Sequence, residues 1–253
     1  MTASGTYVYC IVSSSTPITT ASTPGLPGAG PVRALDIQPG RYLIVSDAPL
    51  AEFGEAPLAA KLSDLDWVSR AAVAHESVNE SFMTSSPPAD AVVPMKLFTL
   101  FTSDARALEE VRKGWRRVQT VIKRLSRNEE WGVRLVFDAS LLKAASTAPA
   151  ASGRGYLLAK RQQHVAATKQ TTEMRKTAGD VIKALRPMAH EVQKRSVSEP
   201  PESRSRLLLD AAFLVPRARA DRFRQSVESR AKKIASAGYA LQLSGPWPPY
   251  SFV

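Results

Sequence analysis

Several short stretches of the first half of the chain are rich in Tyr, Val and Ile and are bounded by turn-forming residues, a pattern typical of β-strands. In the first of them, residues 6–12, the side chains alternate in character. Two others are separated by Pro39-Gly40, which favours a hairpin turn. The strands predicted in this half are 6–12, 32–37, 42–45, 92–101 and 131–137.

Two longer stretches follow the 3.6-residue period of an amphipathic helix. The first begins near Ser63, which together with Asp66 predicts a capping box, and a Pro-Pro pair ends it. The second is predicted to begin at Ser103 or Asp104, either of which can cap it, and to continue to about Arg127.

The order of these elements is strand, two strands, helix, strand, helix, strand. Two helices packed against one face of an antiparallel sheet form a ferredoxin-like α+β arrangement. We therefore predict a ferredoxin-like α+β domain over residues 1–138, with the hairpin as an addition. Residues 139–152 consist largely of Ala, Ser, Thr and Pro, which predicts a linker after this domain.

The rest of the chain predicts a second α+β domain over residues 153–253. A helical pattern begins at Arg154, continues toward Leu185 and ends before Pro187, unless Gly179 divides it in two. Unbroken, this helix is about 45 Å long at 1.5 Å per residue. It is polar nearly all round, so it either protrudes or pairs with another helix. The other predicted elements are strands near 190–197, 207–215 and 239–243, and a helix over 218–237 followed by Gly238.

An extended Pro-rich and aromatic tail closes this second domain, with the sequence Gly-Pro-Trp-Pro-Pro-Tyr-Ser-Phe at residues 245–252. Each proline fixes φ and lacks a backbone N–H, so the tail cannot continue a helix. Trp247, Tyr250 and Phe252 pack either on the chain's own body or on a partner. Because burying a Trp contributes about 2–3 kcal/mol, we expect Trp247→Ala to lower stability or to weaken partner binding.

Charge is distributed unevenly along the chain, whose formal net charge is +11. Residues 1–150 hold 15 Lys and Arg and 15 Asp and Glu, whereas residues 151–253 hold 19 and 8. An electrostatically steered partner is therefore expected to meet the second half. The basic residues proposed there as partner-binding, in or beside the helix at 218–237, are Arg217, Arg219, Arg222 and Arg230.

This basic helix permits three interpretations: a solvated face, a surface for an acidic protein, and a surface for nucleic acid. Ferredoxin-like sheets bind RNA by stacking bases on aromatic strands. The sequence contains no such strand, and its basic excess lies on a helix face, so nucleic acid is not expected among the partners.

Composition excludes several protein classes. A hydrophobic content of 44% is that of a folded chain. No apolar run reaches the roughly 18 residues that cross a bilayer, and no signal peptide opens the sequence, so we expect a cytoplasmic location and no membrane. The single cysteine, Cys10, excludes an internal disulfide and a Cys-based zinc site.

Candidate catalytic and metal-binding residues are few. His75-Glu76 resembles half of a zinc-protease helix, but Asn79 stands where the second His is needed. Cys10 lies in an apolar strand, where thiols are usually inert. The Gly-rich loop over residues 25–30 lacks the lysine and the following helix of a phosphate-binding loop. We therefore predict no catalytic residue, no metal site and no cofactor.

Short motifs in a fixed order extend over nearly all 253 residues. They are Tyr-Val-Tyr-Cys-Ile-Val at 7–12, Arg-Tyr-Leu-Ile-Val-Ser-Asp at 41–47, the Trp-to-His-Glu helix at 66–76, Val-Pro-Met-Lys-Leu-Phe-Thr at 93–99, Glu-Trp-Gly-Val at 130–133, Gly-Arg-Gly-Tyr-Leu-Leu at 153–158 and the tail. In this order they resemble the gas vesicle F/L family (GvpF/GvpL), accessory proteins that help bacteria and archaea to build gas-filled protein shells. Cys10 and Phe98 stand where the family usually has glycine.

The resemblance implies a non-enzymatic role in gas vesicle assembly, in the cytoplasm and at the gas vesicle. The implied partners are the small GvpA-like shell protein and other gas vesicle accessory proteins. From another class, the alternative is a basic nucleic-acid-binding module on a ferredoxin-like scaffold. Trp247, Tyr250 and Phe252 join the four arginines as proposed partner-binding residues.

Overall fold

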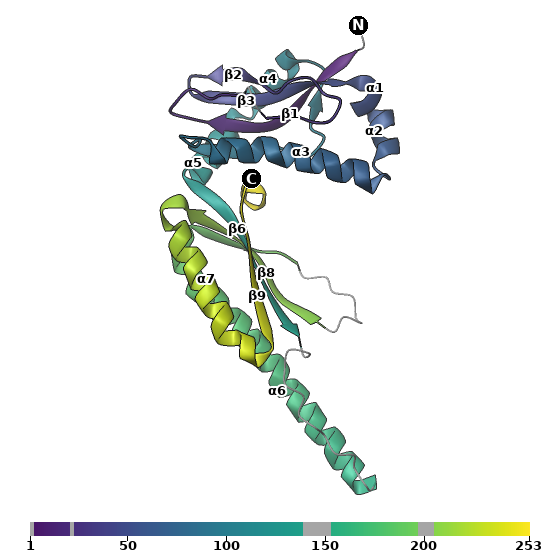
Figure 1. Cartoon of the computed structure of the whole chain (residues 1–253), viewed down its shortest axis with the longest axis vertical. Helices are drawn as coiled ribbons and strands as arrows, with labels where there is room; N and C mark the ends of the chain where they lie inside the picture. The colour runs from purple at the N-terminus through teal and green to yellow at the C-terminus, as the bar shows by residue number, and fades with distance from the viewer. Residues whose placement is uncertain (1–2, 21–22, 139–152, 197–204) are drawn as a thin grey trace. The chain divides into compact units, whose positions relative to one another are not determined.

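The computed structural model describes residues 3–20, 23–138, 153–196 and 205–253, with the backbone alone for 153–164, Ala166 and Ala167. The predicted linker at 139–152 lies outside these residues. The chain forms two compact units (Figure 1), which we treat separately. Unit 1 is Met1–Glu130 together with Trp247–Val253, and unit 2 is Trp131–Pro246. Both units combine helices with a β-sheet, so the predicted α+β class is confirmed.

Unit 1 is built on an antiparallel sheet with strand order β2-β3-β1-β4, to which β5 adds by pairing with β1. A ferredoxin-like unit arranges its four strands in this order. No helix joins β1 to β2 in the described part of unit 1, because a Ser-, Thr-, Pro- and Gly-rich loop takes its place. The strands are β1 (Ser4–Ser13), β2 (Arg33–Gln38), β3 (Arg41–Pro49), β4 (Ala91–Pro94) and β5 (Leu100–Phe101).

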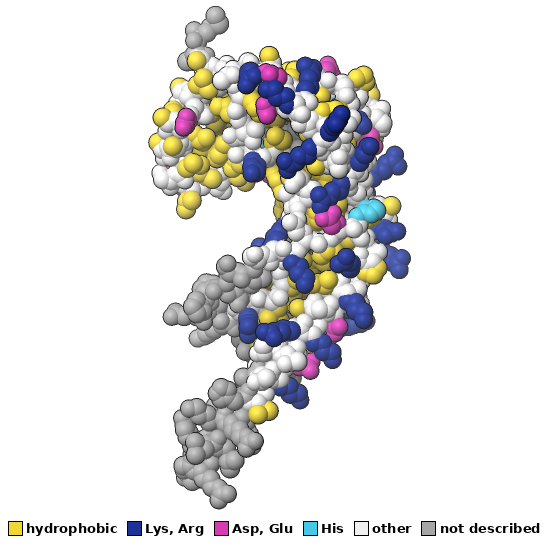
Figure 2. Space-filling model, turned by 180° about the vertical axis from the view of Figure 1, so that it is seen from behind, with side chains coloured by type: hydrophobic (Ala, Val, Ile, Leu, Met, Phe, Trp, Pro, Cys, Tyr) yellow, Lys and Arg dark blue, Asp and Glu magenta, His cyan; other side chains and the backbone are white. Residues whose placement is uncertain are grey.

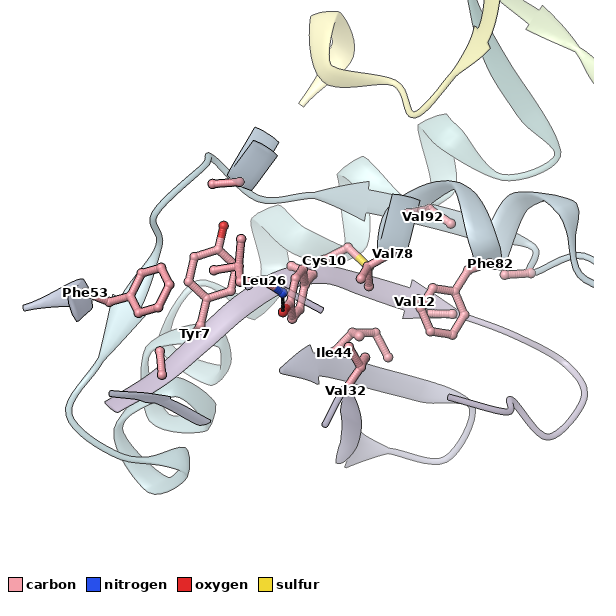
Figure 3. Close-up of a cluster of buried hydrophobic side chains, with 14 residues drawn as sticks. Tyr7, Cys10, Val12, Leu26, Val32, Ile44, Phe53, Val78, Phe82 and Val92 are labelled. Carbon is pink, nitrogen blue, oxygen red and sulfur yellow. Dashed lines mark hydrogen bonds between the residues drawn. The ribbon is translucent and has the colours of Figure 1, made fainter. Parts of the chain in front are cut away.

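The core of unit 1 lies between this sheet and the longest of its helices, α3 (Leu65–Thr84). Tyr7 and Val12 of β1 pack with Val78 and Phe82 of α3 in one buried cluster (Figure 3). The other helices are α1 (Leu50–Phe53), α2 (Glu55–Lys61), α4 (Asp104–Lys113) and α5 (Trp115–Leu125).

Helices cover both faces of the sheet, so the prediction of two helices on one face is wrong. Ile11 of β1 and Val93 of β4 are not in the cluster with α3, and line a pocket together with Val111 of α4 and Val118 of α5. Neighbouring side chains on a strand point to opposite faces, so α4 and α5 lie on the face opposite α3. The predicted single helix to Arg127 is two helices separated by Gly114.

Capping residues explain where the helices of unit 1 begin. Ser103 caps α4, as predicted, by accepting a hydrogen bond from the backbone N–H of Arg106. At α3 the cap is Asp64, which accepts from the Trp67 N–H, and not Ser63.

Unit 2 is a complete βαββαβ unit with strand order β7-β8-β6-β9, so it is itself ferredoxin-like. The predicted strand at 131–137 is its first strand and not the last strand of the first sheet. Consequently the units divide after Glu130, and not after residue 138. The elements are β6 (Asn128–Asp138), α6 (Gly153–Leu185), β7 (Glu191–Lys194), β8 (Ser205–Pro216), α7 (Ala220–Ile234) and β9 (Tyr239–Trp247).

The helix α6 is unbroken through Gly179 and extends beyond the sheet of unit 2 (Figure 1). Its buried residues Met174, Val181 and Leu185 lie in the C-terminal part and join the unit 2 core. Nearer its N-terminus, described side chains such as Val165 and Lys169 are exposed. The protruding arrangement considered for this polar helix is therefore the one observed. No helix in the described part of the chain is long and apolar enough to cross a membrane.

Candidate functional site: a docked C-terminal segment beside an apolar groove

The C-terminal segment, Trp247–Val253, packs within unit 1 and ends in a short 3-10 helix over Tyr250–Phe252. Phe252 is the anchor of the segment, because only 1% of its surface is exposed. The Arg124 guanidinium lies 5.8 Å from the centre of its ring, within the range of a cation–π interaction. Trp247 is 40% exposed and Tyr250 38% exposed. Of the three aromatic residues predicted to bind a partner, Phe252 is therefore buried, whereas Trp247 and Tyr250 are partly exposed.

Tyr250 binds two polar residues of α3. Its hydroxyl donates a hydrogen bond of 2.7 Å to Glu76 Oε2 and accepts one of 2.7 Å from Asn79 Nδ2. Burial raises the pKa of Tyr250, and its hydrogen bond to Glu76 raises it further. Burial also raises the pKa of Glu76, against the opposing effect of the Tyr250 hydroxyl. The exposed ring of Tyr250 is thus fixed at its polar end.

Ser251 attaches the segment to the last residue of unit 1 before β6 enters unit 2. Its backbone N–H and its hydroxyl donate hydrogen bonds of 2.8 and 2.7 Å to the two carboxylate oxygens of Glu130. Glu130 is 2% exposed. Hydrogen bonds to a charged acceptor are stronger than neutral ones, so this pair fixes the position of Phe252.

The His75-Glu76 motif belongs to this docking site and to the core. Four residues after His75 stands Asn79, whose amide donates a hydrogen bond to the Tyr250 hydroxyl of the docked segment. His75 is buried, and its Nδ1 accepts a 2.7 Å hydrogen bond from the Tyr7 hydroxyl. Its Nε2 lies 3.2 Å from the Met95 carbonyl, to which it donates. Burial lowers the pKa of His75 to about 4, so the ring is neutral at pH 7.

An apolar groove lies beside the docked segment, on the sheet face covered by α4 and α5. It has a volume of about 470 Å³. Its polar margin includes Lys96, Glu110 and Arg117. The apolar residues that line it are Ile11, Val93, Pro94, Met95, Phe101, Val111, Val118, Val121 and Val253. Val253 is therefore shared between the C-terminal segment and the groove.

Phe98, between β4 and β5, adopts a left-handed backbone conformation with φ of 64°. Its ring stacks on Trp67 of α3, with centroids 5.4 Å apart and planes 11° apart. A left-handed conformation costs an L-residue about 1–2 kcal/mol, a cost that glycine would not incur. Here the stacking offsets the strain.

Substitutions at Phe98 separate these two effects. Phe98→Ala removes the stacking and keeps the strain, whereas Phe98→Gly removes both. We therefore expect Phe98→Gly to be more stable than Phe98→Ala by about 1 kcal/mol, as measured by urea unfolding. Equal stability of the two variants, or a more stable Ala variant, would show that the left-handed backbone at residue 98 is not strained.

The two remaining candidates have structural explanations. Cys10 is fully buried, and burial raises the pKa of its thiol. In the Gly-rich loop, a Cβ atom at Gly25 would collide with the Tyr9 hydroxyl, and Gly28 has φ of 82°. The Leu26 N–H donates to that same hydroxyl, so the loop closes over Tyr9.

The predicted basic residues belong to unit 2, whereas the C-terminal segment belongs to unit 1. Arg222 is exposed on α7 and Arg230 is half-buried there, whereas Arg217 and Arg219 form the turn before α7. Arg219 Nη1 lies 3.4 Å from the Pro187 carbonyl. Lys and Arg side chains, dark blue in Figure 2, follow unit 2 with few acidic side chains among them.

Sequence reasoning missed Asn79, Glu76 and Glu130 as docking residues and missed the groove. The resemblance motifs contain Glu76 and Glu130, but nothing in their spacing connects either residue to the tail. These contacts join residues that are 121 to 174 positions apart in the chain, and only the fold brings them together.

Comparison with known proteins places the chain among gas vesicle proteins. A family model described as gas vesicle synthesis protein GvpL/GvpF matches residues 5–253. Gas vesicle protein L of Streptomyces sp. strain CB03234 is 30% identical over 97% of this chain and 91% of its own length. Gas vesicle protein F of the same strain is 30% identical over 98% of this chain and 99% of its own length.

Solved structures show the same fold. The crystal structure of GvpF from Anabaena sp. PCC7120 matches with a TM-score of 0.69 at 18% identity, over 98% of this chain and 95% of that one. GvpF from Microcystis aeruginosa matches with a TM-score of 0.67 at 20% identity, over 98% of both chains.

Proposed function

The chain belongs to the gas vesicle GvpL/GvpF family, and from this membership we propose that it is a non-enzymatic assembly factor that binds the small gas vesicle shell protein. A gas vesicle accessory role follows from the family itself. The proposal adds the partner and the surface, which is the apolar groove of unit 1.

The groove supports this proposal because its lining is mostly apolar and its margin is charged. A shell protein that assembles around gas must expose apolar side chains before it polymerises. Burying one Val, Leu or Ile side chain contributes about 1.5–3 kcal/mol. A groove of about 470 Å³ holds only a few such side chains, and association itself costs several kcal/mol. The binding is therefore expected to be reversible, as a factor that releases its partner requires.

A carboxylate placed in the groove tests this proposal. Val118 lies in the groove wall on α5 and is half-buried. We expect Val118→Asp to weaken binding of the purified shell protein at least tenfold, because the carboxylate would have to be desolvated when an apolar side chain enters. Gln119→Asp is the matched control, because Gln119 is exposed on the same helix and does not line the groove.

Binding would be measured with immobilised shell protein, and circular dichroism would verify that both variants are folded. Equal affinity of the folded Val118→Asp and Gln119→Asp variants would reject the groove as the binding surface. Trp247 and the four arginines remain proposed contacts outside the groove, with Trp247 the most exposed aromatic residue of the C-terminal segment.

Nucleic acid is the second candidate partner, on account of the basic composition of unit 2. The unit holds 21 Lys and Arg and 9 Asp and Glu. Its outer sheet face carries Arg134, Asp210 and Gln242 in the described strands, with no aromatic side chain for base stacking. We therefore favour a protein partner.

A further inference from the structure

A second groove lies within unit 2, between the middle of α6 and the C-terminal end of α7. It has a volume of about 530 Å³. Phe137 and Tyr239 form its floor, with ring centroids 5.3 Å apart, and Ile234 forms part of its wall. Both rings belong to the buried core of unit 2, so the packing of this core fixes the floor of the groove.

The margin of this groove is charged. Lys169 of α6 and Lys233 of α7 line it from its two sides, together with Glu173. Neither lysine forms an ion pair with a described residue. The margin therefore offers two ammonium groups to acidic side chains on either side of an apolar contact.

The protruding part of α6 extends the groove with an unsupported helix face. Val165, Lys169 and Glu173 recur at four-residue intervals and so lie on one stripe of α6. Val165 is 62% exposed. Most helical stability in proteins comes from tertiary packing and not from helix propensity, so a second helix packed along the stripe would stabilise this part of α6.

We propose that the groove between α6 and α7 binds an acidic amphipathic helix of a partner protein. The apolar face of that helix covers Ile234, Tyr239 and Val165, and acidic residues at its edges pair with Lys169 and Lys233. This is the helix-in-groove mode of recognition. The inference stands on unit 2 alone and does not depend on binding of the shell protein by unit 1.

The test uses the full chain and a fluorescent synthetic peptide of about 18 residues, with Leu at helical i, i+3, i+4 and i+7 positions and Glu elsewhere. We expect the peptide to bind with an affinity that falls as salt rises, and to slow amide hydrogen exchange in residues 165–177. Lys169→Glu with Lys233→Glu is expected to weaken binding at least tenfold.

Lys183→Glu with Arg186→Glu is the matched control, because it changes the same charge at exposed residues of unit 2 that do not line the groove. Ile234→Ala is a second variant that tests the apolar contact without a charge change. Equal weakening by the control pair, or binding without slowed exchange in 165–177, would overturn the proposal. Tighter binding of a 20-nucleotide single-stranded DNA than of the peptide, lost in the Lys169→Glu and Lys233→Glu variant, would assign the surface to nucleic acid instead.

Discussion

Phe252→Ala is expected to lower the free energy of unfolding of unit 1 by about 3–5 kcal/mol, the range for truncating a buried Phe. The ring is 1% exposed, and its removal would leave a cavity beneath Arg124. Since a folded domain is stable by about 5–15 kcal/mol, this is a large fraction of the total. Urea unfolding followed by circular dichroism measures it.

Trp247→Ala is the control for this prediction. The sequence led us to expect Trp247 as the stabilising aromatic residue, but its side chain is 40% exposed. We expect this variant to lose less than half as much stability as Phe252→Ala. A larger loss for Trp247→Ala would contradict the docking of the segment through Phe252.

Acid is expected to destabilise unit 1 through His75. The folded pKa of about 4 lies below the ordinary value of 6.5, so between these values the unfolded chain binds a proton that the folded chain does not. The contribution of neutral His75 to the free energy of unfolding is therefore fully present above pH 6.5. It is lost as the pH falls toward 4, and the loss is about 3 kcal/mol in total. His75→Gln is expected to remove this part of the pH dependence, as urea unfolding at pH 7 and pH 4.5 would show.

His190→Gln is the matched control, because His190 is exposed in unit 2. It should leave the pH dependence of the wild type unchanged. Carboxylates titrate in the same pH range in the wild type, in His75→Gln and in His190→Gln. Their contribution therefore cancels when the pH dependence of the three proteins is compared. An unchanged slope in His75→Gln would show that His75 is not the buried neutral group described here.

Local signals in the sequence predicted much of the fold. The Ser103 cap, the glycine before β9 and the strands β1, β2 and β3 all follow from short-range chemistry. The strand predicted over 92–101 is instead two strands, β4 and β5, separated by residues 95–99. The strand at 131–137 was predicted correctly but assigned to the wrong sheet, because alternation defines a strand's buried face and not its neighbours. In the structure Trp131, Val133 and Leu135 face the unit 2 core.

The candidate site could be predicted only in part. The Pro-rich aromatic tail suggested a segment that packs on a surface, but composition could not rank its aromatic residues. Phe252 is buried because the turn at Tyr250–Phe252 directs it inward while Ser251 binds Glu130. The groove was not predictable, since its lining comes from β1, β4, β5, α4, α5 and Val253.

Co-purification with the small shell protein tests the central claim most directly. The wild-type chain and the Val118→Asp variant would be co-expressed with the shell protein and purified with and without nuclease treatment. We predict nuclease-resistant co-purification with the wild type and at least a tenfold smaller yield with Val118→Asp. Absence of the shell protein from the wild-type sample, with nucleic acid retained on the chain, would contradict the account.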